Sequence, residues 1–227
     1  MSATGRAIGT MVIVGGVVAL GAVGIAWAVR SARSPALASG TGPSAAMGDA
    51  EMAEIVRDMR IAPFAGEDHR GAAADPTMFR DRWTVVSFGF VHCTLVCPML
   101  HSEIHRMAEK LADRGVRFVT FTVDPAHDTV ASMAMHVDQW AMPGDAWTFV
   151  RTDEDALGGV LAGLQLGDLT VDASNPIVLA GGETIPNILH PTRFFVVGPD
   201  GSVKGMWRGS DPASVDAMIR WLMDRTR

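Results

Sequence analysis

The two cysteines of this 227-residue chain lie close together in the segment FVHCTLVCPMLHSEI, residues 90–104. Three residues separate Cys93 from Cys97, so both sulfur atoms face the same side if a single helical turn joins them. Two neighbouring thiols form a redox pair, supply two ligands to a soft metal ion, or pack as small apolar side chains. The surrounding elements decide between these uses.

Histidines are the other soft ligands that the chain offers, and it has seven of them. His101 and His105 are spaced four apart on the helix expected after the cysteines, a spacing that can hold a metal ion but more often gives a solvated face. His92 adjoins Cys93 and is interpreted as a supporting or structural residue. No partner can be assigned from the sequence to three others, which are His69, His127 and His136.

The elements around the cysteines predict a strand–helix–strand unit. Residues 83–90, WTVVSFGF, are a near-continuous apolar run typical of a buried central strand. Apolar residues then recur at helical spacing from Leu100 to Leu111, and Gly115 provides a helix end. A second strand follows at residues 116–123. Such a unit has parallel strands and a right-handed crossover, and ligands and reactive groups gather at its strand-to-helix junctions.

Pro98 suits the first turn of a helix, so Cys97 is expected at or just before the helix start and Cys93 in the loop. A helix N-terminus stabilises a thiolate, so we expect at least one of the two thiols to have a lowered pKa. Because the cysteines lie together at this junction, a pair of structural core thiols is the least favoured of the three uses.

The rest of the chain predicts a central sheet with helices on both faces. Thr129 or Asp128 caps a helix that ends near Trp140, and the DPAHDT stretch favours a turn and cap over a metal site at Asp124 and Asp128. A strand at 146–150, an acidic-starting helix at 153–164, a hairpin at 192–209 and an amphipathic helix at 211–225 complete the order.

The N-terminal residues read as a membrane anchor. Residues 7–29 carry no charge, and 23 residues in a helix span a hydrocarbon core of roughly 30 Å. We expect an uncleaved anchor over residues 1–30, a flexible Ser-, Ala-, Gly- and Pro-rich tether over residues 31–50, and one domain over residues 51–227. Arg6 on one side and Arg30 and Arg33 on the other leave the orientation nearly balanced.

Composition excludes several other classes. A net charge of −6, from 19 basic and 25 acidic residues, is unsuited to nucleic-acid binding, which needs clustered Lys and Arg. Two cysteines are too few for a disulfide scaffold or for a closed, cysteine-rich zinc site within one chain.

Three stretches in order resemble the Sco/SenC family, which has thioredoxin-fold copper proteins that are anchored in membranes and assist assembly of the dinuclear copper site of cytochrome c oxidase. They are VSFGFVHCTLVCPM, FVTFTVDPAHDT and LHPTRFFVVGPDG. The last places His190 eight residues before a G-P-D-G turn, as in the family. The resemblance covers roughly residues 60–225.

The resemblance implies that Cys93, Cys97 and His190 are copper ligands. Two thiolates and one imidazole suit Cu(I) or Cu(II) better than a hard ion, and three protein ligands leave a position open for an acceptor's ligand. It further implies a metallochaperone whose partner is the copper-bearing subunit of cytochrome c oxidase or another copper protein, on the inner membrane with its domain in the periplasm. Nucleic acid is not an expected partner.

Two residues depart from the family pattern. The family usually has an acidic residue two places after the first cysteine and an Asp just before the histidine, whereas this chain has Leu95 and Leu189. The loss of two carboxylates removes expected hydrogen-bond partners near the metal, so metal affinity or partner choice is expected to differ.

Thiol–disulfide exchange through Cys93 and Cys97 is the alternative function, with Cys93 as the more exposed nucleophile. The HPT step at residues 190–192 resembles the Pro-Thr step of thioredoxin-like reductases, in which the proline is cis and lies against the cysteines. We therefore predict a cis bond between His190 and Pro191. A peroxide-reducing relative, with Thr94 three residues before Cys97, is a less favoured third class.

Overall fold

The computed structural model describes residues 48–94 and 96–226. The predicted anchor, residues 31–47 of the predicted tether, and Leu95 lie outside these ranges. Within the described residues, no helix is long and apolar enough to cross a membrane. Helix α2 (Asp49–Val56) begins two residues before the predicted start of the domain.

A seven-stranded mixed sheet forms the centre of the domain, in the order β11-β10-β3-β4-β5-β1-β2. Strands β3, β4 and β5 are parallel, whereas β10 runs antiparallel to both β3 and β11, and β1 runs antiparallel to β5. The strands are β1 (Gly66–Asp68), β2 (Ala73–Ala74), β3 (Thr84–Gly89), β4 (Arg117–Thr122), β5 (Trp147–Thr152), β10 (Arg193–Val197) and β11 (Val203–Arg208).

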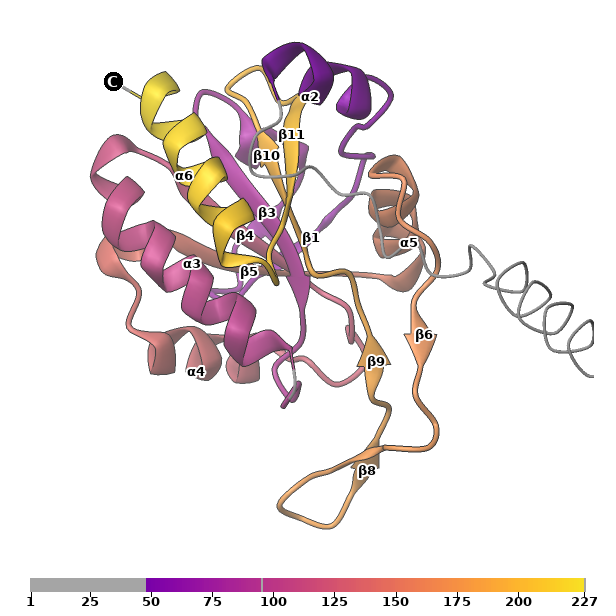
Figure 1. Cartoon of the computed structure of the whole chain (residues 1–227). Coiled ribbons are helices and arrows are strands. Elements are labelled where there is room, and N and C mark those ends of the chain that lie inside the picture. The colour runs from indigo at the N-terminus through magenta and orange to yellow at the C-terminus, as the bar shows by residue number, and fades with distance from the viewer. Residues whose placement is uncertain (1–47, 95, 227) are drawn as a thin grey trace, which may run out of the picture. The chain divides into compact units, whose positions relative to one another are not determined.

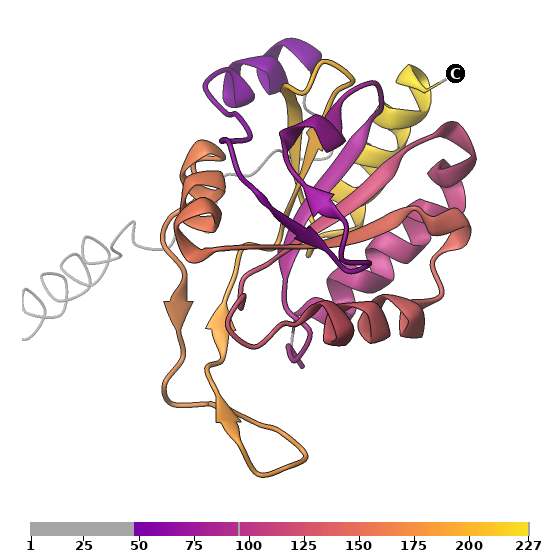
Figure 2. The same cartoon turned by 180° about the vertical axis from the view of Figure 1, so that it is seen from behind.

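Helices flank this sheet. Figure 1 shows α3 and α6 side by side in front of the strands, and Figure 2 shows them behind the strands when the molecule is turned. Helix α2 packs on β11 and helix α4 on β5. The remaining helices are α3 (Cys97–Leu111), α4 (Val130–Trp140), α5 (Glu154–Gly163), α6 (Pro212–Arg225) and the 3₁₀ turns η1 (Pro76–Phe79), η2 (Ala112–Arg114) and η3 (Pro143–Asp145).

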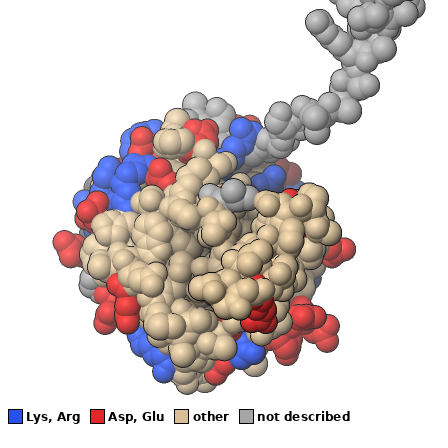
Figure 3. Space-filling view, turned by 90° about the horizontal axis from the view of Figure 1, so that it is seen from below, with Lys and Arg blue, Asp and Glu red and all other residues tan. Residues whose placement is uncertain are grey.

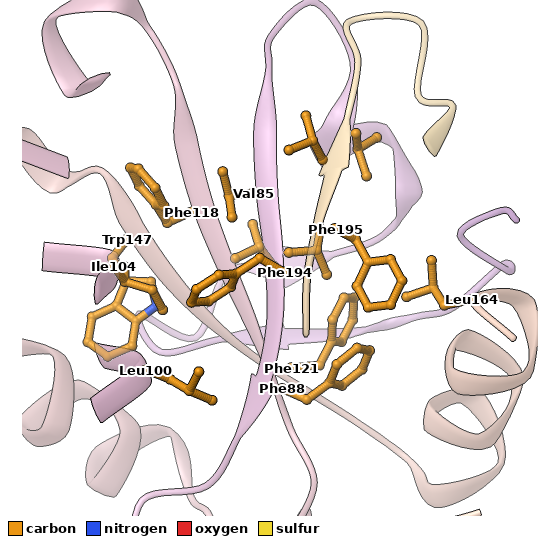
Figure 4. Close-up of a cluster of buried hydrophobic side chains, with 14 of the residues drawn as sticks. Val85, Phe88, Leu100, Ile104, Phe118, Phe121, Trp147, Leu164, Phe194 and Phe195 are labelled. Carbon is orange, nitrogen blue, oxygen red and sulfur yellow. The ribbon is translucent and has the colours of Figure 1, made fainter. Parts of the chain in front are cut away.

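The core follows from strands that are apolar along their whole length. All six residues of β3 are buried, as expected for a central strand covered on both faces. Because successive side chains point to opposite faces, the apolar residues divide into two groups. Figure 4 shows Leu100, Ile104 and Trp147 in one group, and Phe88, Phe121, Phe195 and Leu164 in the other.

Between α5 and β10 the chain leaves the sheet in a long excursion. Its short strands pair antiparallel, β6 (Thr170–Val171) with β9 (Ile188–Leu189) and β7 (Ile177–Val178) with β8 (Thr184–Ile185). Figure 1 shows the excursion reaching past the end of the sheet. It returns to the sheet immediately before β10, which determines where His190 lies.

The predicted element order from β3 to α6 is confirmed, including the parallel β3–β4 pair and the hairpin β10–β11. Thr129, rather than Asp128, caps α4, in a reciprocal capping box with Ser132. The sequence did not predict α2, the edge strands β1 and β2, or the strand pairs of the excursion, since these segments are too short to show a period.

Candidate metal centre

The cysteines lie where the end of β3 leads into α3. The amide of Cys93 donates to the carbonyl of Phe90 at 3.2 Å, which closes a turn directly after the strand. Helix α3 begins at Cys97, with Pro98 in its first turn, as predicted. Cys93 is therefore a loop residue and Cys97 is the first residue of the helix.

His190 reaches the same place from the far end of the sequence. It follows β9 directly and precedes β10, which pairs with β3. Its Nε2 lies 3.2 Å from the Sγ of Cys97 and 3.8 Å from the Sγ of Cys93. All three donor atoms lie within 4.8 Å of one another, so the structure brings together the three residues that the resemblance implied.

The imidazole of His190 is oriented for binding through Nε2. Its Nδ1 lies 3.2 Å from the carbonyl oxygen of Pro191. A carbonyl oxygen only accepts, so Nδ1 carries the proton and Nε2 presents its lone pair to the two sulfur atoms. Histidine ligands commonly donate their second N–H to a carbonyl in this way. Phe90 packs edge-on against the ring, with centroids 6.0 Å apart.

Burial differs between the two thiols, neither of which is in a disulfide. Cys97 is 1% exposed and Cys93 9%. Cys93 raises the pKa of the Cys97 thiol by hydrogen bonding to it, and burial raises it further. The lowered pKa predicted for at least one of the two thiols is not that of Cys97, because a neighbouring sulfur atom and burial outweigh the helix N-terminus.

The arrangement fits one soft metal ion. Metal bonds of about 2.3 Å to sulfur and about 2.0 Å to nitrogen put three donors around one ion roughly 3.5–4 Å apart. The donors need only small movements to reach this spacing from their present positions. Two sulfurs and one imidazole suit copper, and the described residues offer no further His, Cys, Asp or Glu donor within this cluster.

The predicted cis bond is wrong. None of the described peptide bonds is cis, so His190 and Pro191 are joined in trans. In the reductases the proline itself lies against the cysteines, whereas here the imidazole of His190 takes that place. The trans bond agrees with the ordinary preference of X–Pro bonds, which is about 0.5–1 kcal/mol.

Asp128 is a site residue whose role the sequence did not indicate. Its fully buried carboxylate accepts from the amide of Val91 at 3.1 Å and from the hydroxyl of Thr122. It therefore ties the end of β4 to the residue two before Cys93. The parallel pairing of β3 and β4 was the available signal, because it places the segments after both strands at one edge.

The carboxyl of Asp128 should make stability depend on pH. Burial raises its pKa to about 6, above the usual value of 3.8. The folded state then binds the proton more tightly than the unfolded state, so stability is lost as pH rises from about 4 through 6, by about 3 kcal/mol. Urea unfolding at a series of pH values gives the free energy of unfolding of the wild type and of Asp128→Asn. The wild type should lose this stability between about pH 4 and pH 6, and Asp128→Asn should not. Parallel profiles would contradict it.

Gly89 leaves room for the sulfur of Cys97. A methyl group at this position would lie 3.0 Å from that Sγ and 3.5 Å from Nε2 of His101. We expect Gly89→Ala to displace the sulfur, lower copper affinity about tenfold, and destabilise the fold by about 1–3 kcal/mol. The matched control is Gly158→Ala on α5, where nothing lies within 4 Å. Unchanged copper affinity and unfolding midpoint in Gly89→Ala would refute the prediction.

The other predicted candidates lie elsewhere. His101 and His105 do not form a metal pair, because His101 is buried and bonds His136 while His105 faces Glu109 on the surface. Leu189 is 52% exposed, beside the site. Leu95 lies outside the described residues.

The mixed sheet with its flanking helices, together with two cysteines at a strand-to-helix junction, defines a thioredoxin-like metal-binding domain. The SCO1/SenC family model matches residues 53–224, well over half of the chain. The chain therefore belongs to the SCO1/SenC family.

Individual relatives match this chain only over a short segment or at low sequence identity. Protein SCO2 homolog, mitochondrial, of Bos taurus is 38% identical over 77 residues, which are 32% of this chain and 29% of that protein. The chain thus spans under a third of that relative. The SCO1 protein homolog of Bacillus subtilis is 22% identical over 161 residues, covering 70% of this chain and 79% of that protein.

A solved structure shares the fold. Arabidopsis thaliana ScoI with copper bound matches with a TM-score of 0.57 and 17% identity, over 72% of this chain and 96% of that chain. The described architecture is therefore that of the family.

Proposed function

We propose that this chain is a membrane-anchored copper-binding protein that delivers copper to, or reduces the thiols of, the copper centre of cytochrome c oxidase during its assembly. The observation that carries the proposal is the convergence of Cys93, Cys97 and His190 within 4.8 Å. Membership of the SCO1/SenC family and the copper bound by the similar Arabidopsis protein support copper as the metal.

The surroundings of the site suit transfer to another protein. Figure 3 views the molecule from the end at which α4 and β8 lie in Figure 1, and charged side chains are largely confined to the margin of this face. Large exposed apolar side chains come from α3, α4 and the excursion, namely Met99, Met135, Val171, Val178 and Leu189. Such a face suits close contact with a protein partner.

Attachment to the inner membrane, with the domain in the periplasm, is part of the proposal. The uncharged run at residues 7–29 supports the anchor, since it is long enough to span a bilayer. The arginines on the two sides of this run are nearly balanced and do not decide its orientation. The periplasmic orientation is proposed from the family's task at an oxidase copper centre.

Copper titration tests the proposal. The reduced wild type should retain at least one equivalent of Cu(I) and show a thiolate-to-copper charge-transfer band with Cu(II). Cys93→Ser/Cys97→Ser should lose the band, whereas His105→Ala, which changes a surface histidine, should keep it. A wild type without the band and without retained Cu(I) would end the copper proposal.

Thiol–disulfide exchange is the second candidate function, because the two thiols lie side by side and differ in exposure. Cys93, the more exposed, would attack a substrate disulfide and release one substrate thiol. Cys97 would then attack the mixed disulfide, releasing the second thiol and leaving a Cys93–Cys97 disulfide. Stoichiometric reduction of insulin by the metal-free protein, lost in Cys93→Ser, would favour this function.

A further inference from the structure

A second pair of soft ligands lies beside the candidate metal centre. Nδ1 of His101, on α3, and Nε2 of His136, on α4, face each other at 3.2 Å. His101 is 2% exposed, whereas His136 is half-buried. The pair therefore leads from the side of the domain into its interior.

Several aromatic rings pack against this pair. The ring of His101 lies 4.9 Å from that of Trp147 and 5.4 Å from that of Trp140, and both histidines contact Phe149. Burial lowers the pKa of both imidazoles, that of His101 to about 3, so both are neutral near pH 7. Neutral imidazoles offer lone pairs without first losing a proton to solvent.

The pair lies next to the thiols. The space at Gly89 is bounded by Sγ of Cys97 and by Nε2 of His101, the ring nitrogen that does not face His136. His101 therefore lies between His136 and Cys97, with Nδ1 towards His136 and Nε2 towards the sulfur atom.

We propose that His101 and His136 form a second Cu(I) site, at which the ion is held before it enters the cysteine site. Only the choice of metal rests on the proposed copper function. The structure supports this through two imidazole nitrogens that face each other, next to the buried thiol of Cys97.

Coordination chemistry favours a monovalent soft ion here. Two metal–nitrogen bonds of about 2 Å put the nitrogens about 4 Å apart on either side of a linear ion, so the rings need to separate by under about 1 Å. Zn²⁺ would need further ligands. One of the two neutral imidazoles carries the proton of the hydrogen bond between the rings. When the ion binds, this proton moves to the other nitrogen of the same ring, so no proton is released.

Transfer to the cysteines is a ligand exchange without redox chemistry. Cu(I) leaves the two imidazole nitrogens and binds the sulfurs of Cys93 and Cys97 with Nε2 of His190. The two thiol protons go to solvent, and the shared imidazole proton returns between His101 and His136.

Silver(I), a redox-inert substitute for Cu(I), tests the second site in the full-length reduced protein. In Cys93→Ser/Cys97→Ser we expect one equivalent of Ag(I) to bind, with ¹⁵N shifts at His101 Nδ1 and His136 Nε2. Adding His136→Gln should lower that affinity at least tenfold, whereas adding His105→Gln, one turn along α3 from His101, should not change it. His136→Gln alone should still bind copper at the cysteine site, which shows that it folds.

Two results would overturn the inference. One is no Ag(I) binding by the double cysteine variant, and the other is binding that His136→Gln leaves unchanged. Neither affects the proposed function, which depends on the cysteine site. Conversely, if the wild type shows no thiolate-to-copper band and binds no more Cu(I) or Ag(I) than the double cysteine variant does at the histidines, the proposed function fails and the second site stands.

Discussion

His190→Ala should lower copper affinity at least about 100-fold. Loss of a residue that merely supports a metal ligand costs 10–100-fold, and His190 supplies one of the three donor atoms itself. Its removal leaves Cys93 and Cys97 as the protein ligands of the ion. Competition against a chelator of known affinity measures the change, and the energy of the thiolate-to-Cu(II) band should shift as nitrogen is lost.

His105→Ala is the matched control for this experiment. His105 lies on the surface of α3 and contacts Glu109 at 3.9 Å, away from the sulfurs. The His105→Ala variant should bind copper with the affinity of the wild type. If His190→Ala also kept wild-type affinity and the same band, the metal would be held by other atoms and the third ligand would be assigned wrongly.

The sequence predicts the elements that carry the cysteines because their patterns of apolar residues are long and clear. The buried run of β3, the apolar stripe of α3 and Pro98 together place Cys97 at a helix start. His190 is different, since a partner 93 residues away along the chain has no local signal. It could be assigned only through the resemblance to a known family.

Interactions between neighbouring elements were harder to predict. Asp128 contacts Val91 because β3 and β4 end at the same edge of the sheet. The sequence pattern indicates only a turn or cap role for Asp128, which does not predict this contact. His101 meets His136 because α3 and α4 approach each other, which helical spacing alone does not show. The pKa of Cys97 also depends on burial and on Cys93, and both are properties of the folded chain.

Metal binding should link three segments of the domain through one ion. The ligands come from the loop after β3, the start of α3 and the segment between β9 and β10. Ordering of the last segment also orients Leu189, whose exposed side chain adjoins the ligand. Copper loading would therefore order the exposed surface beside the site.

Copper loading should raise the melting temperature of the wild type by about 8–16 °C. An ion that binds only the folded state adds RT ln(1 + [L]/Kd), about 4.1 kcal/mol at a free concentration of 1,000 Kd. Each kcal/mol moves the midpoint by about 2–4 °C in a domain of this size. Calorimetry with chelator-buffered Cu(I) measures the shift, and hydrogen exchange should slow at residues 188–192. Cys93→Ser/Cys97→Ser should show under a quarter of the shift. If the wild type bound copper stoichiometrically but kept its melting temperature, the unfolded chain would hold copper as tightly as the folded one. The two thiols alone would then determine the affinity, and the position of His190 beside them would not matter.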